Sequence, residues 1–170
     1  MRQRARRAVG LLGILAAVSL ILAAVGLAQP NADVRGAWKW VSVEISSSDG
    51  NKLEPMGPSP RGHLVFDRSG HFAYLIARKD LPRFAGSSRE DGTAEENRAA
   101  MRGTLAMSGT YTVAGNVLTF KIEASNYPNL VGTDRKVTIL SLTESELRYS
   151  NPTPSNAGGG TAIAVARRVN

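Results

Sequence analysis

The segment RGAWKWVSVE, residues 35–44, is the first part of the chain with a clear strand pattern. Trp38 and Trp40 alternate with Lys39 and Val41, and this period of two is typical of a β-strand. A Gly-x-Trp opening says little by itself. It becomes informative only if the remaining strands form a structure with an open end that the Trp38 ring can cover. The number and pairing of those strands therefore decide whether Trp38 has this role.

An uncharged apolar stretch, residues 8–28, precedes this segment and follows four arginines. Small residues at positions 26 and 28 then precede Gln29. This order is typical of a secretory signal peptide, which we expect to span residues 1–28. The stretch is long for such a peptide, so an uncleaved N-terminal anchor is the alternative. In either case we expect residues 29–170 to be exported, to the periplasm or outside the cell, with membrane contact only through the leader.

The charge of the chain does not favour a nucleic-acid partner. The full sequence carries 21 basic and 14 acidic side chains, a net charge of +7. Cleavage would remove the four leader arginines and leave 17 basic against 14 acidic groups, or +3, and these are scattered along the chain. The chain has no cysteine, so an exported domain must be stabilised by its core and not by disulfides.

Strand-like patterns alternate with turn-rich segments from residue 33 onward. The exception is a predicted short helix at about 93–106, where Thr93 can act as the N-cap and Glu95 and Glu96 fall in the first turn. The pattern predicts an all-β fold: an eight-stranded antiparallel up-and-down barrel with this helix inserted, and a sandwich as second choice. The eight expected strands are residues 36–46, 61–67, 71–78, 108–114, 117–125, 135–142, 146–150 and 161–169.

Two hairpins have a register that the sequence determines, because apolar side chains of paired strands must share a face. Phe66 can face Phe72 only across a loop with an odd number of residues, and residues 68–70 supply three. Val113 can face Leu118 only across an even loop, and a Gly-Asn pair supplies two.

The hairpin around residues 143–145 leaves its register open. Val137 and Ile139 favour one inner face for the preceding strand, whereas Leu140 and Leu142 favour the other. We therefore assign neither face from the sequence.

The expected inner face of the barrel carries a few polar groups among apolar ones. Arg78 continues the inward series of Tyr74, and Arg78 with Tyr74 and Tyr111 would hold a carboxylate or enolate, because a guanidinium binds a carboxylate with two hydrogen bonds. Both histidines alternate outward, and no catalytic, metal-binding or cofactor motif is present. The candidate ligand-binding residues are Arg78, Tyr74, Tyr111, Trp40, Phe120, Glu44 and Arg135, the last with an unresolved strand phase.

The order and spacing of several segments resemble the lipocalin-like domain family of bacterial and fungal proteins. The resemblance implies a barrel with a cavity, in which Gly36 and Trp38 begin the first strand and the indole packs across one end. It brings no settled activity, and Trp40 stands where an aliphatic residue is expected. The matching segments are GAWKWVSVE (36–44), residues 57–78, residues 83–113, YPNLVGTDRKV (127–137) and TAIAVARRV (161–169).

These observations favour an exported protein that binds a small hydrophobic ligand, either anionic or neutral, inside the barrel. An eight-stranded barrel is wide enough to hold one small ligand or to be filled by its own side chains. Two alternatives therefore stay open: an isomerase or cyclase acting on a hydrophobic substrate in the same cavity, and a filled barrel with a structural role. Oligomeric state is not predicted.

Overall fold

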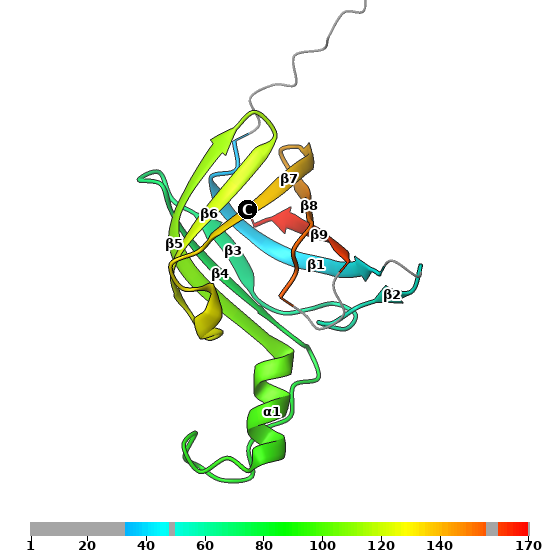
Figure 1. Ribbon diagram of the computed structural model, residues 1–170, viewed down its shortest axis with the longest axis vertical. Coiled ribbons are helices and arrows are strands. Elements are labelled where there is room, and N and C mark those ends of the chain that lie inside the picture. The colour runs from blue at the N-terminus through cyan, green and yellow to red at the C-terminus, as the bar shows by residue number, and fades with distance from the viewer. Residues whose placement is uncertain (1–32, 48–49, 156–159, 170) are drawn as a thin grey trace, which may run out of the picture. The chain divides into compact units, whose positions relative to one another are not determined.

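The computed structural model describes residues 33–47, 50–155 and 160–169, and this part of the chain is mostly β-strand (Figure 1). The expected leader, residues 1–28, lies outside the described residues. The strands are β1 (Gly36–Ser46), β2 (Lys52–Leu53), β3 (His63–Phe66), β4 (His71–Ala77), β5 (Thr104–Ala114), β6 (Val117–Ser125), β7 (Asp134–Leu142), β8 (Glu146–Asn151) and β9 (Thr161–Arg168). The helices are α1 (Ala94–Gly103) and the short 3-10 turn η1 (Pro128–Leu130).

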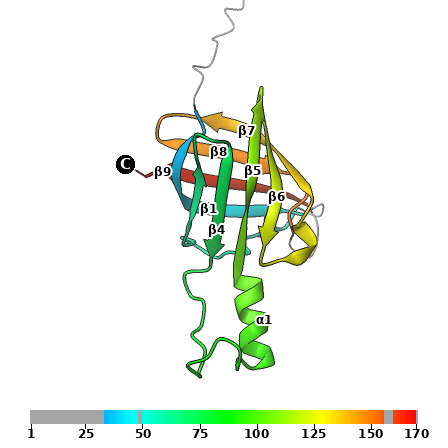
Figure 2. The same ribbon diagram turned by 90° about the vertical axis from the view of Figure 1, so that its left-hand side faces the viewer.

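Strand β1 closes the sheet into a barrel. It pairs with β3 on one edge and with β9 on the other, and each strand from β3 to β9 pairs antiparallel with the next. The result is a closed barrel of eight strands, as predicted, and not a sandwich (Figures 1 and 2). The two-residue strand β2, which the sequence analysis did not anticipate, extends the sheet beside the end of β1.

Both hairpin registers predicted from side-chain alternation are confirmed. Phe66 pairs with Phe72, and Val113 pairs with Leu118. Gly70 has a φ of 89°, the left-handed conformation that this three-residue turn requires and that glycine adopts without strain. The inward side chains of β4 are buried and its outward ones exposed, and Phe66 and Phe72 both pack against Phe120 in the core.

Helix α1 begins as predicted but ends earlier. Thr93 is the N-cap: its side chain accepts from the Glu96 backbone N–H, and the Glu96 carboxylate accepts from the Thr93 N–H. The helix stops at Gly103, since residues 104–107 belong to β5 and turn Met107 into the core. The end at about residue 106 is therefore wrong, because strand pairing with β4 outweighs the helical propensity of this segment. Figure 2 shows α1 extending away from the barrel end.

A β-bulge in β1 reverses the expected orientation of its second half. The register with β9 shifts between Trp40 and Ser42, so Ile45 is buried whereas Glu44 faces outward. Glu44 is partly exposed and forms an ion pair with Lys52 at 2.8 Å. The expected inward position of Glu44 is wrong, because strict alternation does not continue through a bulge.

A second bulge explains the ambiguous hairpin at 143–145. The register of β7 with β8 shifts between Ile139 and Ser141, and Leu140 at the bulge is exposed. Val137 and Ile139 before the bulge and Leu142 after it can therefore all pack against the same core. Both apolar sets that competed in the sequence contribute to the inner face.

Trp38 closes one end of the barrel, as the opening segment suggested. It has no exposed surface, and its indole N–H donates to the Val34 carbonyl at 2.6 Å. The Arg168 guanidinium carbon lies 4.1 Å from the ring centroid, a cation–π contact. Gly36 has a φ of 116°, and a Cβ there would lie 2.8 Å from the Arg168 side chain, so glycine suits both the backbone and the contact.

We expect Trp38→Ala to lower the free energy of unfolding by about 3–5 kcal/mol, because it removes a large buried ring and leaves a cavity. Urea unfolding followed by circular dichroism measures the change. Lys39→Ala, at the neighbouring exposed position, is the control and should have little effect. A Trp38 variant as stable as the control would show that the indole does not support the barrel end.

Candidate functional site

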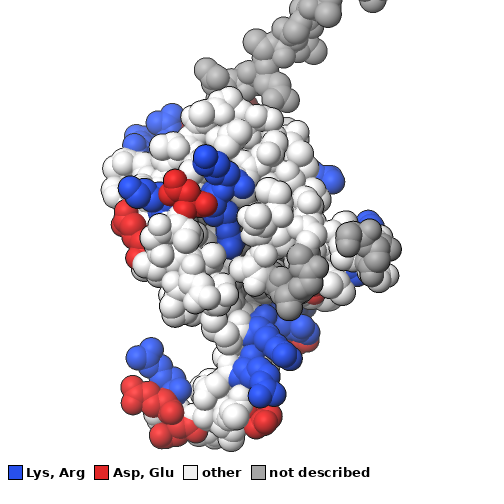
Figure 3. Space-filling model, in the orientation of Figure 1, with Lys and Arg blue, Asp and Glu red and all other residues white. Residues whose placement is uncertain are grey.

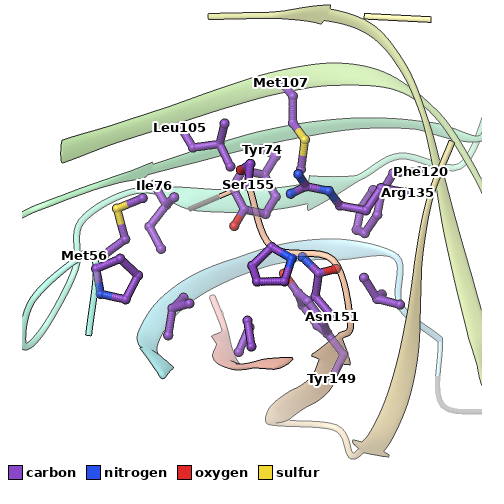
Figure 4. A pocket seen from close by; sticks show the side chains of 16 residues that line it. Met56, Tyr74, Ile76, Leu105, Met107, Phe120, Arg135, Tyr149, Asn151 and Ser155 are labelled. Carbon is purple, nitrogen blue, oxygen red and sulfur yellow. The ribbon is translucent and has the colours of Figure 1, made fainter. Parts of the chain in front are cut away.

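A small internal cavity lies in the barrel beyond the layer of aromatic rings. Its volume is about 40 Å³, room for about three water molecules and well below the roughly 300–1,000 Å³ of typical ligand pockets. The wall is mainly apolar, with polar groups from several strands (Figure 4). Its apolar side chains include Val43, Met56, Ile76, Leu105, Met107, Phe120 and Val137; its polar ones are Tyr74, Arg135, Tyr149, Asn151 and Ser155.

Arg135 is the only charged side chain among the described residues that line this cavity. It is the second residue of β7 and faces inward with Val137, which resolves the strand phase that the sequence left open. The residue is 8% exposed. In the described part of the chain Arg135 has no ion pair and no side-chain hydrogen bond. No fully buried side-chain nitrogen there lacks a partner, so the guanidinium nitrogens keep a small accessible surface, and the charge faces the cavity without a carboxylate partner.

Two buried tyrosines lie beside this guanidinium, Tyr74 from β4 and Tyr149 from β8. Burial raises the pKa of Tyr74 to about 12, although the positive charge of Arg135 and the Tyr149 hydroxyl act in the opposite direction. Burial also raises the pKa of Tyr149 well above 10, and the neighbouring Tyr74 raises it further. Both phenols are therefore neutral at ordinary pH; one hydroxyl donates to the other, and the pair keeps one proton to donate.

Asn151 completes the polar side of the cavity. It is 7% exposed, and its side-chain oxygen accepts from the Thr153 backbone N–H at 3.1 Å. That contact uses the acceptor of the amide and leaves its NH₂ group as a donor. The guanidinium, two hydroxyls and this amide make a donor-rich surface, which matches a ligand group rich in acceptors, such as a carboxylate.

The structure brings three of the seven expected ligand-binding residues into the cavity wall: Tyr74, Phe120 and Arg135. A fourth, Trp40, lies behind it. Its ring centroid is 4.8 Å from that of Tyr74, and its indole N–H donates to the Leu75 carbonyl at 2.8 Å. Trp40 therefore orients Tyr74 without lining the cavity.

The expected inward position of Arg78 is wrong. Strand β4 ends at Ala77, so the alternation that places Tyr74 and Ile76 inside stops before Arg78. The Arg78 side chain is 42% exposed and donates two hydrogen bonds of 2.9 Å to the Asp80 carboxylate. A nearby acidic residue thus compensates this cation at the rim of the barrel.

The expected place of Tyr111 at the polar end of the cavity is also wrong. Tyr111 lies at the Trp38 end of the barrel, where its ring packs edge-on against Phe66 at 4.7 Å. Its hydroxyl donates to the Asp67 carbonyl at 2.9 Å. The residue supports the hairpin between β3 and β4.

Sequence reasoning did not select Tyr149 and Asn151. Both lie on β8, the second strand of the hairpin whose register the bulge at Leu140 obscured. The signal that could have found Tyr149 is its alternation with Leu147, since both are buried. Asn151 carries no such signal, because a polar residue at a strand end ordinarily faces water.

The described residues give little support for a histidine-based site, a metal site or a membrane-spanning helix. His63 and His71 are exposed on the outer face, as expected. No group of three or more metal-ligating side chains is placed to hold a metal ion in the part of the chain that the structure describes. The described helices include none with the length and apolar character that a membrane crossing needs.

A closed eight-stranded antiparallel barrel is the architecture of lipocalin-like proteins. The model of the lipocalin-like domain family matches residues 35–169, and the chain belongs to this family. No curated protein matches the sequence.

Solved structures with low sequence identity cover most of the chain. A lipocalin-like protein from Bacteroides uniformis is 16% identical, with a TM-score of 0.43 over 79% of this chain and 97% of the other. An uncharacterized protein from Bacteroides eggerthii is 14% identical, with a TM-score of 0.42 over 81% and 100% of the two chains. A redesigned β-barrel is 14% identical, with a TM-score of 0.39 over 80% and 91%.

The buried tyrosines give an expectation for alkaline pH. Between about pH 10 and 12 the unfolded chain loses the Tyr74 proton while the folded chain retains it, so stability falls as the pH rises through this window. Two pKa units correspond to about 3 kcal/mol. We expect Tyr74→Phe to flatten this part of the curve of unfolding free energy against pH, measured with urea from pH 8 to 11.5. Parallel curves for the variant, wild type and a Tyr127→Phe control would contradict this assignment.

Proposed function

We propose that this protein binds a small apolar molecule carrying a carboxylate or a similar anionic group, with Arg135 holding the anion. The observation that carries the proposal is the buried guanidinium, which faces the cavity and has no carboxylate partner among the described residues. Tyr74 and Tyr149 add neutral donors beside it, and the remaining wall is mainly apolar. Few polar groups on an apolar surface are typical of sites for small ligands.

The energetics of burial support an anionic partner. An uncompensated charge in an apolar interior destabilises the fold, and a bound carboxylate would offset that cost with charge-assisted hydrogen bonds. The same reasoning explains why Arg135 is a better candidate than Arg78. Asp80 already neutralises Arg78 in water, whereas no carboxylate among the described residues pairs with Arg135.

The cavity must enlarge to hold such a ligand. A volume of about 40 Å³ cannot enclose an apolar molecule of ordinary size, so binding requires the wall to move. The cavity volume equally favours a second candidate, a barrel filled by its own side chains with a structural role. Export of the protein remains part of the first proposal, supported by the leader-like pattern of residues 1–28.

Arg135→Met separates these two functions. We expect the variant to bind straight-chain carboxylates about 10- to 100-fold more weakly than wild type, because it loses hydrogen bonds to a charged group. The unliganded variant should be at least as stable as wild type, since a buried unpaired charge is gone. Isothermal titration with acids from hexanoate to hexadecanoate measures binding, and thermal unfolding measures stability.

Lys136→Met is the matched control, because Lys136 is the next residue of β7 and is exposed on the outer face. The corresponding primary alcohols, which lack the charge, should bind wild type and Arg135→Met alike. Equal affinity of the acids for wild type and Arg135→Met would exclude Arg135 as the anion site. Absence of binding by wild type would favour the filled barrel.

A further inference from the structure

An open groove of about 560 Å³ lies outside the cavity, where α1 meets the barrel end. Strand β2, the last turn of α1 and the start of β5 form its sides, and Tyr127 from the β6–β7 connection also lines it. We call this the outer groove and define it by Leu53, Met56, Met101, Arg102, Leu105 and Tyr127. Its volume falls within the range of sites for small organic ligands, which the internal cavity does not reach.

The outer groove and the internal cavity share part of one wall. Pro55, Met56, Leu105 and Ser155 line both spaces. Met56 is 6% exposed, and in Figure 4 it lies on the opposite side of the cavity from Arg135. Because methionine is unbranched and flexible, its side chain can change rotamer at low cost. If the Met56 side chain moved, the outer groove would open into the internal cavity, and a ligand could extend from the groove to Arg135.

The groove combines apolar side chains with a few charged ones, an arrangement that can hold an amphipathic ligand. Leu53 is 51% exposed and Met101 is 43% exposed, so both offer apolar surface that a ligand in the groove can cover. Basic side chains gather where α1 leaves the barrel (Figure 3). Three charged residues line the groove: Arg78, which pairs with Asp80, and Arg102 and Glu54, which have no ion pair in the described part of the chain.

We propose that the outer groove is the second half of the binding site and holds the apolar chain of a long, slender carboxylate whose head group reaches Arg135. This inference rests on the proposed function and specifies its ligand class: a chain too long for the barrel interior. Arg102 attracts the anion, Met56 moves aside for the head group, and the rest of the ligand chain covers Leu53 and Met101.

The length of the carboxylate tests this arrangement. For wild type, each added methylene between hexanoate and hexadecanoate should strengthen binding by about fourfold until the groove is full. The double variant Leu53→Gln with Met101→Gln should weaken hexadecanoate binding by about tenfold, because the chain loses two apolar contacts. Hexanoate, which does not reach the groove, should bind the variant and wild type equally in isothermal titration.

The matched control is Val113→Gln with Leu140→Gln, which places the same substitutions at exposed apolar residues away from the groove. Equal weakening of hexadecanoate binding by both double variants, or none by either, would overturn the outer groove as a site. If acids bind through Arg135 with no dependence on length, only this inference fails. If no acid binds wild type, the proposed function fails as well.

Discussion

The pairing of β1 with both β3 and β9 is the constraint on which the rest of the structure depends. Closure gives every strand one inner and one outer face, so each inward side chain must fit a fixed, narrow interior. At one end Trp38 and the Phe66–Phe72–Phe120 cluster fill that interior. The polar side chains Arg135, Tyr149 and Asn151 lie in the remaining part of the interior, around the cavity.

A barrel with only a structural role has no need of a charged side chain at the buried position of Arg135. Its neighbours in the cavity wall are mainly apolar, and the two tyrosines beside it are neutral at ordinary pH. A filled core would be served as well by an apolar residue of similar size, since replacing buried charges by apolar groups is often stabilising. Under the proposed function, this charge gains its partner when an anionic ligand binds.

Alternation of side chains predicted the fold wherever a strand is uninterrupted. The registers at Phe66 and Val113 followed from parity alone, and the inward row that includes Tyr74 followed from the same rule. The site was predicted less well, because it lies where that rule stops. A bulge turned Glu44 outward, another obscured the strand that carries Tyr149, and the end of β4 placed Arg78 in water. Bulges and strand ends depend on pairing with distant strands, and one strand's own pattern does not contain that information.

The most direct test of the account is the ionisation of a bound carboxylate. Hexadecanoate labelled with ¹³C at its carboxyl carbon can be bound to the protein and its NMR signal followed as the pH is lowered. A carboxylate beside the buried Arg135 guanidinium should have a pKa below that of the same acid free in solution, because the positive charge favours the ionised form. A bound acid that titrates at or above the value of the free acid would contradict the account.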